Sequence, residues 1–395
     1  MKKILIVSHF CSDFESKGNN RFNYLAQILG QRGNQVEFMT SDFSHVKKKP
    51  RTAEAADSSY HVTLIHESGY PKNVSLSRIL SHREFGKNLR KALEKIEKPD
   101  VVYLAVPSLD AALATMQYCK KNKIKLIIDI QDLWPEAFSA AMKRFGIPEF
   151  LFMPMKRQAD LIYRNADEVV AVSQNYLDRA NRVRENQEGY CIYIGTDLAI
   201  FDAYPEIHMD KPDGEQWIVY IGTLGRSYNI DIVIDAVSLL TERGITGFRF
   251  KVFGDGPSME QFKQHANGLP IDFYGRVLYK DLIGYVRNCD IAVNPIVRGA
   301  TQSIINKHAD YAAAGLPVVN TQECEEYRDL LERYKCGINC DVESVEQVAD
   351  AIQELIENPD KRKRMAANSR RMAEECFDRR NTYQQIVKAI ENVVG

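Results

Sequence analysis

Residues 291–319 have the sequence IAVNPIVRGATQSIINKHADYAAAGLPVV, which is the most informative stretch for the fold. The apolar run Ile291–Val293 is typical of a buried strand, and the Ala-rich stretch Ser303–Ala314 has the composition of a helix that Gly315 ends. A second short apolar run, Pro317–Val319, follows at once. Because these runs are continuously apolar rather than alternating, they predict strands of a parallel sheet covered on both faces.

The same alternation of strand and helix extends through the whole chain. In the first half the expected strands are Ile4–Val7, Val36–Met39, Val101–Ala105, Leu126–Ile130, Val169–Val172 and Cys191–Ile194, and the expected helices include Arg21–Gln31, Ile79–Ile96 and Leu109–Lys121. In the second half the expected strands also include Trp217–Ile221, Phe248–Phe253 and Ile271–Tyr274, with helices at Ile230–Arg243, Ser258–Ala266 and Lys280–Asn288. This pattern predicts an α/β chain of two tandem, Rossmann-like doubly wound domains with a ligand in a cleft between them.

One polar stretch, Asp202–Gln216 with Pro205 and Pro212, breaks the alternation and is the expected linker. We therefore predict a first domain over residues 1–200, a second domain over 201–377 and a C-terminal helical segment over 378–395.

Composition excludes several classes of protein. The 395 residues are 45% hydrophobic and 27% charged, and 52 Lys and Arg nearly cancel 53 Asp and Glu, so the basic surface that a general nucleic-acid binder needs is missing. The eight cysteines are scattered and do not form a zinc-binding pattern. The apolar run at 4–7 is shorter than the apolar core of a signal peptide, which is about 7–15 residues long. We expect a cytoplasmic protein with reduced thiols and neither a metal nor a cofactor.

Two loops in the first half follow expected strands. Residues 8–21 (SHFCSDFESKGNNR) include Gly18 before a helix start, where free backbone N–H groups favour an anion, although an ordinary turn explains the loop equally well. Residues 129–136 (DIQDLWPE) place two carboxylates and a tryptophan at the end of a strand. A carboxylate there could bind a sugar hydroxyl or transfer a proton, and Asp132 could also act as an N-cap.

In the second half, the loop at 222–229 (GTLGRSYN) and the residues Gly254-Asp255-Gly256-Pro257 follow neighbouring strands. Their small residues would let a polar ligand approach the backbone, and Arg226 could bind a diphosphate through two hydrogen bonds. The alternative is a pair of glycine-rich turns with a solvated arginine.

The helix expected at Ser303–Ala314 carries polar residues in an otherwise Ala-rich sequence. Ser303 is a suitable N-cap, and Asn306, Lys307 and Asp310 share about one helical face. Lys307 suits a phosphate, and Asp310 suits ribose or sugar hydroxyls. A solvated polar face is the alternative, but it fits a buried helix poorly.

Two segments could contact an anionic membrane. Lys47–Arg51 is a basic loop, and Phe150–Arg157 places apolar bulk beside a basic pair. Ordinary core packing would explain the second segment as well and is favoured by base rates.

Taken together, these motifs resemble the GT-B glycosyltransferases of family 4, in the branch that serves bacterial capsule and O-antigen synthesis. The resemblance rests on 129–136 (DIQDLWPE), 220–228 (YIGTLGRSY) and 306–319 (NKHADYAAAGLPVV), with shorter matches at 169–173, 194–197, 253–257 and 273–277. It implies retaining transfer of a sugar, without a metal, from a nucleotide diphosphate donor, UDP-linked by preference. The implied acceptor is a saccharide linked to polyprenyl diphosphate, and the protein could be peripheral on the inner face of the cytoplasmic membrane.

The resemblance also implies that the first domain binds the acceptor, that the second binds the donor and that the last helix crosses back to the first domain. Asp310 takes the family's ribose-binding position, Gln302 replaces a usual Glu, and Gln131 or Asp132 falls nearest the usual first-domain His. We predict three catalytic residues: Asp132, Arg226 and Lys307. The predicted donor site comprises Gly18, Gly222, Thr223, Tyr228, Gly254, Asp255, Val277, Arg298, Ser303, Asn306 and Asp310. The predicted acceptor site comprises His9, Lys17, Asn19 and Trp134.

Two other functions fit parts of the pattern. A nucleotide-sugar 2-epimerase shares the two-domain plan but needs no acceptor. A non-enzymatic sugar-binding protein of the periplasmic type would need an export signal, which we do not expect here.

Overall fold

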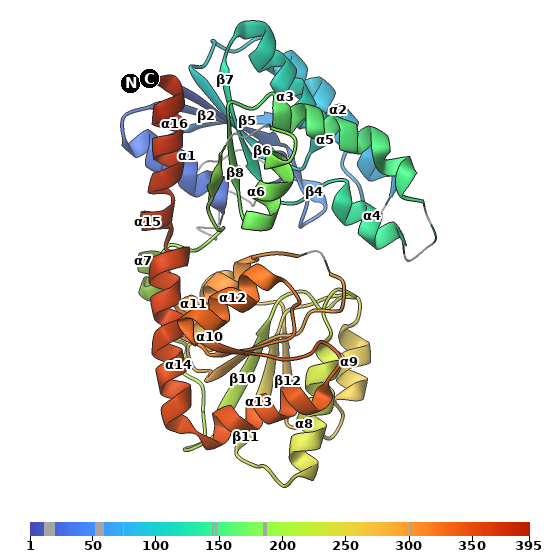
Figure 1. The fold of residues 1–395 in the computed structure, drawn as a ribbon, viewed down its shortest axis with the longest axis vertical. Coiled ribbons are helices and arrows are strands. Elements are labelled where there is room, and N and C mark those ends of the chain that lie inside the picture. Colours follow the sequence, from blue (N-terminus) through green and yellow to red (C-terminus); the bar gives the residue numbers. More distant parts are fainter. Residues whose placement is uncertain are drawn as a thin grey trace. The chain divides into compact units, whose positions relative to one another are not determined.

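The computed structural model describes residues 1–11, 20–51, 59–73, 75–143, 146, 148–184, 188–300 and 302–395. The chain divides into two compact units (Figure 1). Unit 1 comprises Met1–Tyr193 together with Thr382–Gly395, and unit 2 comprises Ile194–Asn381.

Unit 1 is built on a parallel sheet of seven strands. In spatial order these are β5 (His61–Ile65), β2 (Gln35–Ser41), β1 (Lys3–Val7), β6 (Val101–Val106), β7 (Lys125–Ile130), β8 (Glu168–Ala171) and β9 (Tyr190–Cys191). A separate antiparallel ribbon joins β3 (Phe43–Ser44) to β4 (Lys49–Pro50). Every residue of β6 is buried, as the continuous apolar run predicts for a central strand.

Helices cover both faces of this sheet (Figure 1). They are α1 (Arg21–Gln31), α2 (Leu76–Leu93), α3 (Leu109–Asn122), α4 (Glu136–Lys143), α5 (Met153–Arg164), α6 (Gln174–Asn181) and α16 (Gln384–Val394), with a short 3₁₀ turn at Glu149–Phe152. Polar caps fix several starts: the Asn20 side chain accepts from the Phe22 N–H at 2.9 Å, and Ser75 accepts from the Arg78 N–H at 3.2 Å. The Ser75 cap explains why α2 begins before the predicted Ile79.

Unit 2 repeats the architecture with a parallel sheet of six strands. Their order is β12 (Ile271–Gly275), β11 (Phe248–Phe253), β10 (Gln216–Ile221), β13 (Ile291–Asn294), β14 (Val318–Asn320) and β15 (Gly337–Asn339). Its helices are α7 (Leu198–Ala203), α8 (Ile230–Glu242), α9 (Met259–His265), α10 (Tyr279–Val286), α11 (Asn306–Ala313), α12 (Glu325–Tyr334), α13 (Val345–Glu357) and α14 (Pro359–Met372), with α15 (Arg379–Thr382) at its end. The predicted class, two doubly wound α/β domains, is confirmed.

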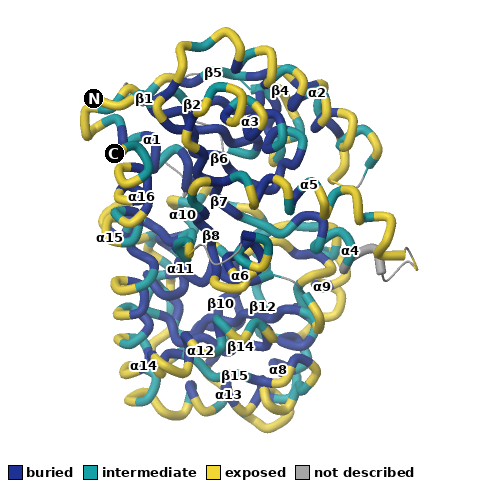
Figure 2. Tube along the Cα trace, turned by 45° about the horizontal axis from the view of Figure 1, so that its top comes forward, coloured by how far each residue is buried: buried dark blue, intermediate teal, exposed yellow. Residues whose placement is uncertain are grey.

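Each unit has its own apolar core. In unit 1 the apolar face of α16, including Ile386 and Ile390, packs into the core formed by β1, β6 and α1. In unit 2 the core lies between the sheet and helices such as α8 and α13. Figure 2 shows buried residues along the central strands and exposed residues on the outer helix faces. None of the helices in the described part of the chain is both long and apolar enough to span a bilayer.

The prediction that residues 202–216 link the two domains is wrong. The stretch 202–216 lies inside unit 2, where the Tyr204 carbonyl accepts from Arg287 at 2.7 Å and Lys211 pairs with Asp290 at 2.5 Å. The chain instead passes between units at Tyr193/Ile194 and again at Asn381/Thr382. The prolines and polar residues of this stretch form an irregular segment that packs on unit 2, because its carbonyls and side chains bond to other residues of unit 2.

A buried ion pair holds both passing segments to unit 1. Arg21 Nε donates to Asp129 Oδ2 at 2.6 Å, and both side chains are buried. Arg21 Nη1 also donates to the carbonyls of Ile192 and Tyr193 and to the hydroxyl of Tyr383, at 3.0–3.1 Å. The Arg21 guanidinium therefore joins the start of α1 and the end of β7 to the two segments at which the chain leaves and re-enters unit 1.

Removing one charge of this pair should destabilise unit 1 strongly. Asp129→Asn leaves the Arg21 guanidinium buried and uncompensated, which we expect to cost about 3–5 kcal/mol. Urea unfolding measures this cost. The control is Asp350→Asn, which breaks the Arg243–Asp350 pair at the surface and should cost about 0–1 kcal/mol. Equal shifts for the two variants would contradict a special role for the buried pair.

Candidate functional site

Glycines end two neighbouring strands of unit 2. Gly222 follows β10 with φ +138° and Gly254 follows β11 with φ +144°, values that favour glycine. A Cβ on Gly254 would lie 1.7 Å from the Gly222 carbonyl oxygen, so the two turns can approach only as glycines. The Leu224 N–H donates to the Asp255 carbonyl at 3.0 Å and joins the loops. The two glycine turns therefore lie close together at the carboxyl edge of the unit 2 sheet.

Lys307 lies directly beneath this glycine turn. Its Nζ is 4.2 Å from the Tyr220 ring centroid and 4.1 Å from that of Tyr228, and a Cβ on Gly222 would be 3.2 Å from it. The side chain is buried, and within the described residues Nζ has no hydrogen-bond partner. Burial holds the pKa of Lys307 well below its usual value.

A buried ammonium without a partner costs free energy unless something compensates it. Two aromatic faces supply part of that compensation through cation–π contacts. No described residue of unit 2 hydrogen-bonds to the Lys307 amine, while Gly222 and Thr223 of the adjacent turn are exposed. This arrangement can hold an anion at the end of β10.

Asp310 lies one turn further along α11 and is also buried. Its Oδ1 accepts a hydrogen bond from the Tyr279 hydroxyl at 2.6 Å. Burial raises the pKa of the Asp310 carboxyl to about 6, although Tyr279 and the charge of Arg379 counteract part of this effect. The carboxylate is therefore mostly ionised at neutral pH and can accept hydrogen bonds from hydroxyl groups.

The other residues predicted for this site surround these two at various depths. Tyr228 forms the ring contact with Lys307 and bridges to Ile296, while Val277 is half-buried just after β12. Thr223, Arg226, Asp255 and Asn306 are exposed. Arg226 is exposed and forms no ion pair with a described residue, so its predicted role in binding a diphosphate stays a prediction.

One prediction here needs correction. Ser303 is not the N-cap, because α11 begins only at Asn306 and Ile305 is the capping residue. The Gln322 side-chain amide donates to the carbonyls of Gln302 and Ser303, at 2.7 and 2.9 Å, and this holds the stretch outside the helix. Ser303 Oγ lies instead 3.5 Å from a Glu326 carboxylate oxygen.

Arg298, also predicted for the donor site, already contacts carboxylates within unit 2. Its guanidinium forms ion pairs with Glu343 at 3.3 Å, Asp341 at 3.6 Å and Glu323 at 3.9 Å. Three carboxylates from later segments therefore already occupy a side chain that the sequence suggested for the donor.

Unit 1 contains a pocket of about 180 Å³ at the carboxyl ends of β1, β6 and β7. It is lined by Ser8, His9, Phe10, Phe22, Ala105, Pro107, Ser108 and Gln131. His9 Nε2 bonds to Glu67 at 2.8 Å and its Nδ1 bonds to Ser108 Oγ at 2.6 Å, so the ring is fixed. Burial alone would raise the pKa of Glu67, but hydrogen bonds from His9, Ser41 and Ser81 bring it to about 2.

An aromatic cluster adjoins this pocket. The Trp134 ring stacks on His82 with 5.8 Å between centroids, and the Trp134 indole N–H donates to Asp132 at 3.2 Å. Burial raises the pKa of Asp132. Burial, together with the charges of His9 and Arg78, lowers the pKa of His82 to about 2, so this ring is neutral. The structure thus brings His9, Asp132 and Trp134 to one edge of the unit 1 sheet.

Three predicted residues, Lys17, Gly18 and Asn19, lie outside the described residues. Sequence reasoning missed Arg21, Glu67, His82 and Tyr279 as contributors, because no local motif marks a side chain whose partner lies tens of residues away.

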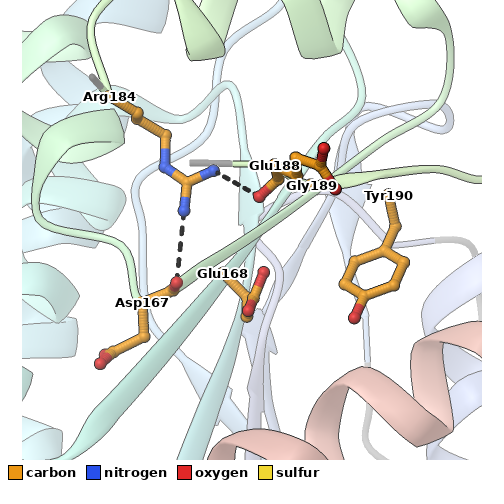
Figure 3. Close-up of a pocket in the computed structure, with 6 residues that line it drawn as sticks. All are labelled: Asp167, Glu168, Arg184, Glu188, Gly189 and Tyr190. Atoms are coloured by element: carbon orange, nitrogen blue, oxygen red, sulfur yellow. Dashed lines mark hydrogen bonds between the residues drawn. The ribbon is translucent and has the colours of Figure 1, made fainter. Parts of the chain in front are cut away.

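A larger hollow of about 510 Å³ lies where β8 and β9 begin. There Arg184 donates to the carbonyls of Asp167 and Glu188 at 3.2 and 3.3 Å, and Glu168, Gly189 and Tyr190 complete the lining (Figure 3). Because ligands of open parallel sheets bind at the carboxyl ends of strands, we assign no function to this amino-end hollow. Within the described part of the chain, no group of three or more His, Cys, Asp or Glu side chains could hold a metal ion.

The two doubly wound units have the two-domain architecture known as GT-B. The model of Glycosyltransferase Family 4 matches residues 19–199, and that of Glycosyl transferases group 1 matches residues 215–358. The chain belongs to the family 4 glycosyltransferases.

Two relatives are similar over part of their length. A GDP-mannose-dependent alpha-(1-6)-phosphatidylinositol dimannoside mannosyltransferase of Mycobacterium tuberculosis is 26% identical over 155 residues, which is 39% of this chain and 39% of that protein. A protein of Escherichia coli K12 named as the colanic acid biosynthesis glycosyl transferase WcaI is 22% identical over 311 residues, 74% of each chain.

Solved structures share the fold over nearly the whole chain. Sucrose-phosphate synthase from Thermosynechococcus elongatus gives a TM-score of 0.75 at 15% identity, covering 100% of this chain and 99% of that one. Anabaena HepE in complex with UDP gives 0.70 at 16% identity, covering 99% and 100%. A UDP-N-acetylglucosamine 2-epimerase gives 0.58 at 12% identity, covering 98% and 96%. These likenesses establish the fold alone.

Replacing Lys307 separates a ligand-binding role from a structural one. Lys307→Met keeps an apolar stem but removes the charge, so UDP affinity should fall about 10- to 150-fold through loss of a charge-assisted contact of about 1.5–3 kcal/mol. The unliganded variant should melt no lower than the parent, because a buried amine without a hydrogen-bond partner has been removed. Calorimetric titration and thermal unfolding measure both. Unchanged UDP affinity with a melting temperature several degrees lower would mean that Lys307 is only structural.

Proposed function

We propose that this protein is a retaining glycosyltransferase that transfers a sugar from a nucleotide diphosphate donor, UDP-linked by preference, to a lipid-linked saccharide in the assembly of a surface polysaccharide. The observation that carries the proposal is the buried, unpartnered Lys307 beneath the Gly222 turn. Asp310 at one turn's distance suits the ribose hydroxyls. The pocket at His9 in unit 1 suits the acceptor saccharide.

In the proposed reaction the protein positions the substrates and stabilises the leaving diphosphate. As the bond to the sugar breaks, negative charge grows on the diphosphate, and Lys307 and the backbone of the Gly222 turn are placed to balance it. The diphosphate then accepts the proton of the incoming hydroxyl on the same face, which retains configuration. Asp132 would orient that hydroxyl, since its two oxygens are already fixed by the Leu133 N–H and the Trp134 indole. Arg226, exposed in the described loop, would add a second positive charge.

The names of the relatives support sugar transfer, but they mention different nucleotides. One names GDP-mannose, whereas the HepE structure contains UDP. WcaI is named for a surface polysaccharide, which supports that setting for this chain. The donor panel must therefore include both UDP- and GDP-sugars.

Turnover distinguishes the proposed transferase from an epimerase. The enzyme should release UDP or GDP from one nucleotide-sugar only when a prenyl-diphosphate-linked N-acetylglucosamine is present, and it should do so in EDTA. Lys307→Met should slow the release. Nucleotide release is measured by chromatography together with analysis of the recovered sugar. Conversion of UDP-N-acetylhexosamine to its 2-epimer without acceptor would contradict the transferase, and loss of activity in EDTA would contradict a metal-independent reaction.

A lipid-linked acceptor requires contact with a membrane, and unit 1 exposes suitable residues. Phe150 and Leu151 are 67% and 56% exposed, next to exposed Lys156 and Arg157. Core packing of this segment, which the sequence favoured on base rates, is therefore wrong. The chain turns there into α5, whose buried face contains Ala159 and Ile162 and leaves these residues outside.

Flotation with phosphatidylglycerol liposomes tests this contact. We expect binding at low salt that weakens as salt screens the basic residues Lys47–Arg51, Lys156 and Arg157. Phe150→Ser with Leu151→Ser should reduce flotation, because apolar area contributes about 25 cal/mol per Å². Leu278→Ser, a comparably exposed change in unit 2, should have no effect. No flotation of the parent at low salt would favour a soluble acceptor.

A further inference from the structure

Two cations flank one buried tyrosine in unit 1. Lys48 Nζ lies 4.5 Å from the Tyr70 ring centroid, and the Arg78 guanidinium carbon lies 5.6 Å from it. Lys48 precedes β4 and Arg78 lies in the first turn of α2. Lys48 adopts φ +55°, a left-handed conformation that is uncommon for a side chain of this kind and is often found at functional positions. The Lys48 backbone is therefore in an unfavourable conformation while its side chain lies beside the Tyr70 ring.

Neither cation has a carboxylate within ion-pair distance among the residues that the structure describes. The carboxylates nearest in this cluster are engaged elsewhere: Glu67 accepts from His9, Ser41 and Ser81, and Asp132 accepts from Leu133 and Trp134. Burial lowers the pKa of Lys48, and the charge of Arg78 lowers it further. Burial likewise lowers the pKa of Arg78. Two like charges thus lie close together without an ion pair, and the hydrogen bonds that both donate to Asn73, one to its side chain and one to its carbonyl, are to neutral acceptors.

This place adjoins the pocket of unit 1. The Arg78 guanidinium is 5.1 Å from the Trp134 ring centroid and 5.9 Å from that of Phe10, and Phe10 lines the pocket. On the outer side, α2 carries apolar residues that remain exposed around Arg78: Leu76 is 79%, Ile79 50% and Leu80 63% exposed. The pocket, the pair of cations and an exposed apolar helical turn therefore adjoin one another through Arg78.

We propose that Lys48 and Arg78 form an anion subsite that holds the diphosphate of a prenyl-diphosphate-linked acceptor, with its saccharide in the pocket beside Phe10. A pocket, a pair of cations and an exposed apolar turn that adjoin one another suit the saccharide, diphosphate and hydrocarbon of such a molecule. Guanidinium and ammonium groups bind phosphate oxygens through charge-assisted hydrogen bonds. The inference deepens the proposed function, on which it rests for the identity of the saccharide.

Binding of farnesyl diphosphate to the full-length protein tests the subsite. Lys48→Gln and Arg78→Gln should each weaken its affinity about tenfold or more, as expected for loss of a charge-assisted contact. Lys87→Gln, which changes an exposed lysine of α2 outside the basic segment Lys47–Arg51, is the charge-matched control and should leave the affinity unchanged. Inorganic pyrophosphate should bind more weakly than farnesyl diphosphate but lose affinity in the same two variants. UDP affinity, which reports on unit 2, should stay constant throughout.

Three results would overturn the subsite. Farnesyl diphosphate affinity could be unchanged in Lys48→Gln and Arg78→Gln. Alternatively, Lys87→Gln could weaken it equally, which would indicate unspecific surface charge. Binding to phosphatidylglycerol vesicles could depend on the pair while farnesyl diphosphate does not bind, which would indicate a lipid headgroup site. If Arg78→Gln also lowers the melting temperature, Lys48→Gln decides: weaker affinity at the parental melting temperature supports the subsite, whereas parental affinity overturns it.

These measurements also separate the subsite from the proposed function. Farnesyl diphosphate binding that depends on Lys48 and Arg78, without consumption of any nucleotide-sugar, would leave the subsite intact and contradict the transferase. Turnover with an unchanged acceptor KM in both variants would support the transferase and contradict the subsite.

Discussion

In the large sheet of each unit, every pairing between neighbouring strands is parallel, so all carboxyl ends of one sheet meet at one edge. Loops that lie far apart in the sequence are therefore brought together there. In unit 2 this constraint places the glycine turns after β10 and β11 beside the start of α11. In unit 1 it gathers the ends of β1, β6 and β7 around the pocket at His9. The amino edge of the unit 1 sheet contains a larger hollow but lacks this convergence.

The two units treat buried charge differently. Unit 1 pairs its deepest cation, because Arg21 meets Asp129 and also donates to two carbonyls of the passing chain. Unit 2 leaves the Lys307 ammonium against two aromatic rings without a carboxylate. A paired charge suits an anchor that must hold the chain, whereas an unpaired one suits a site whose counterion arrives with a ligand. The difference in pairing thus separates a structural cation from a binding cation without reference to any motif.

Much of the fold could be predicted from the sequence, because the continuous apolar runs and the helix stop at Gly315 are local signals. Lys307 and Asp310 could be proposed for the same reason, since their spacing within one helix is visible in the sequence. The start of α11 could not, because Gln322, many residues away, holds Ser303 outside the helix. Arg298 looked available only because Glu323, Asp341 and Glu343 come later in the chain. The Arg21–Asp129 pair joins residues more than a hundred positions apart and leaves no local trace.

The central claim is that a nucleoside diphosphate supplies the missing counterion of Lys307. Burial lowers the pKa of this lysine in the free protein, and a bound diphosphate would favour the charged form, so binding should raise the pKa and take up a proton. Calorimetric titration of UDP at a series of pH values from 7 to 10, where a phosphate with a pKa near 6 is already ionised, in buffers of different ionisation enthalpy measures that uptake directly. The account predicts net proton uptake in the parent that disappears in Lys307→Met. Tight UDP binding with no proton uptake, or the same uptake in both proteins, would contradict it.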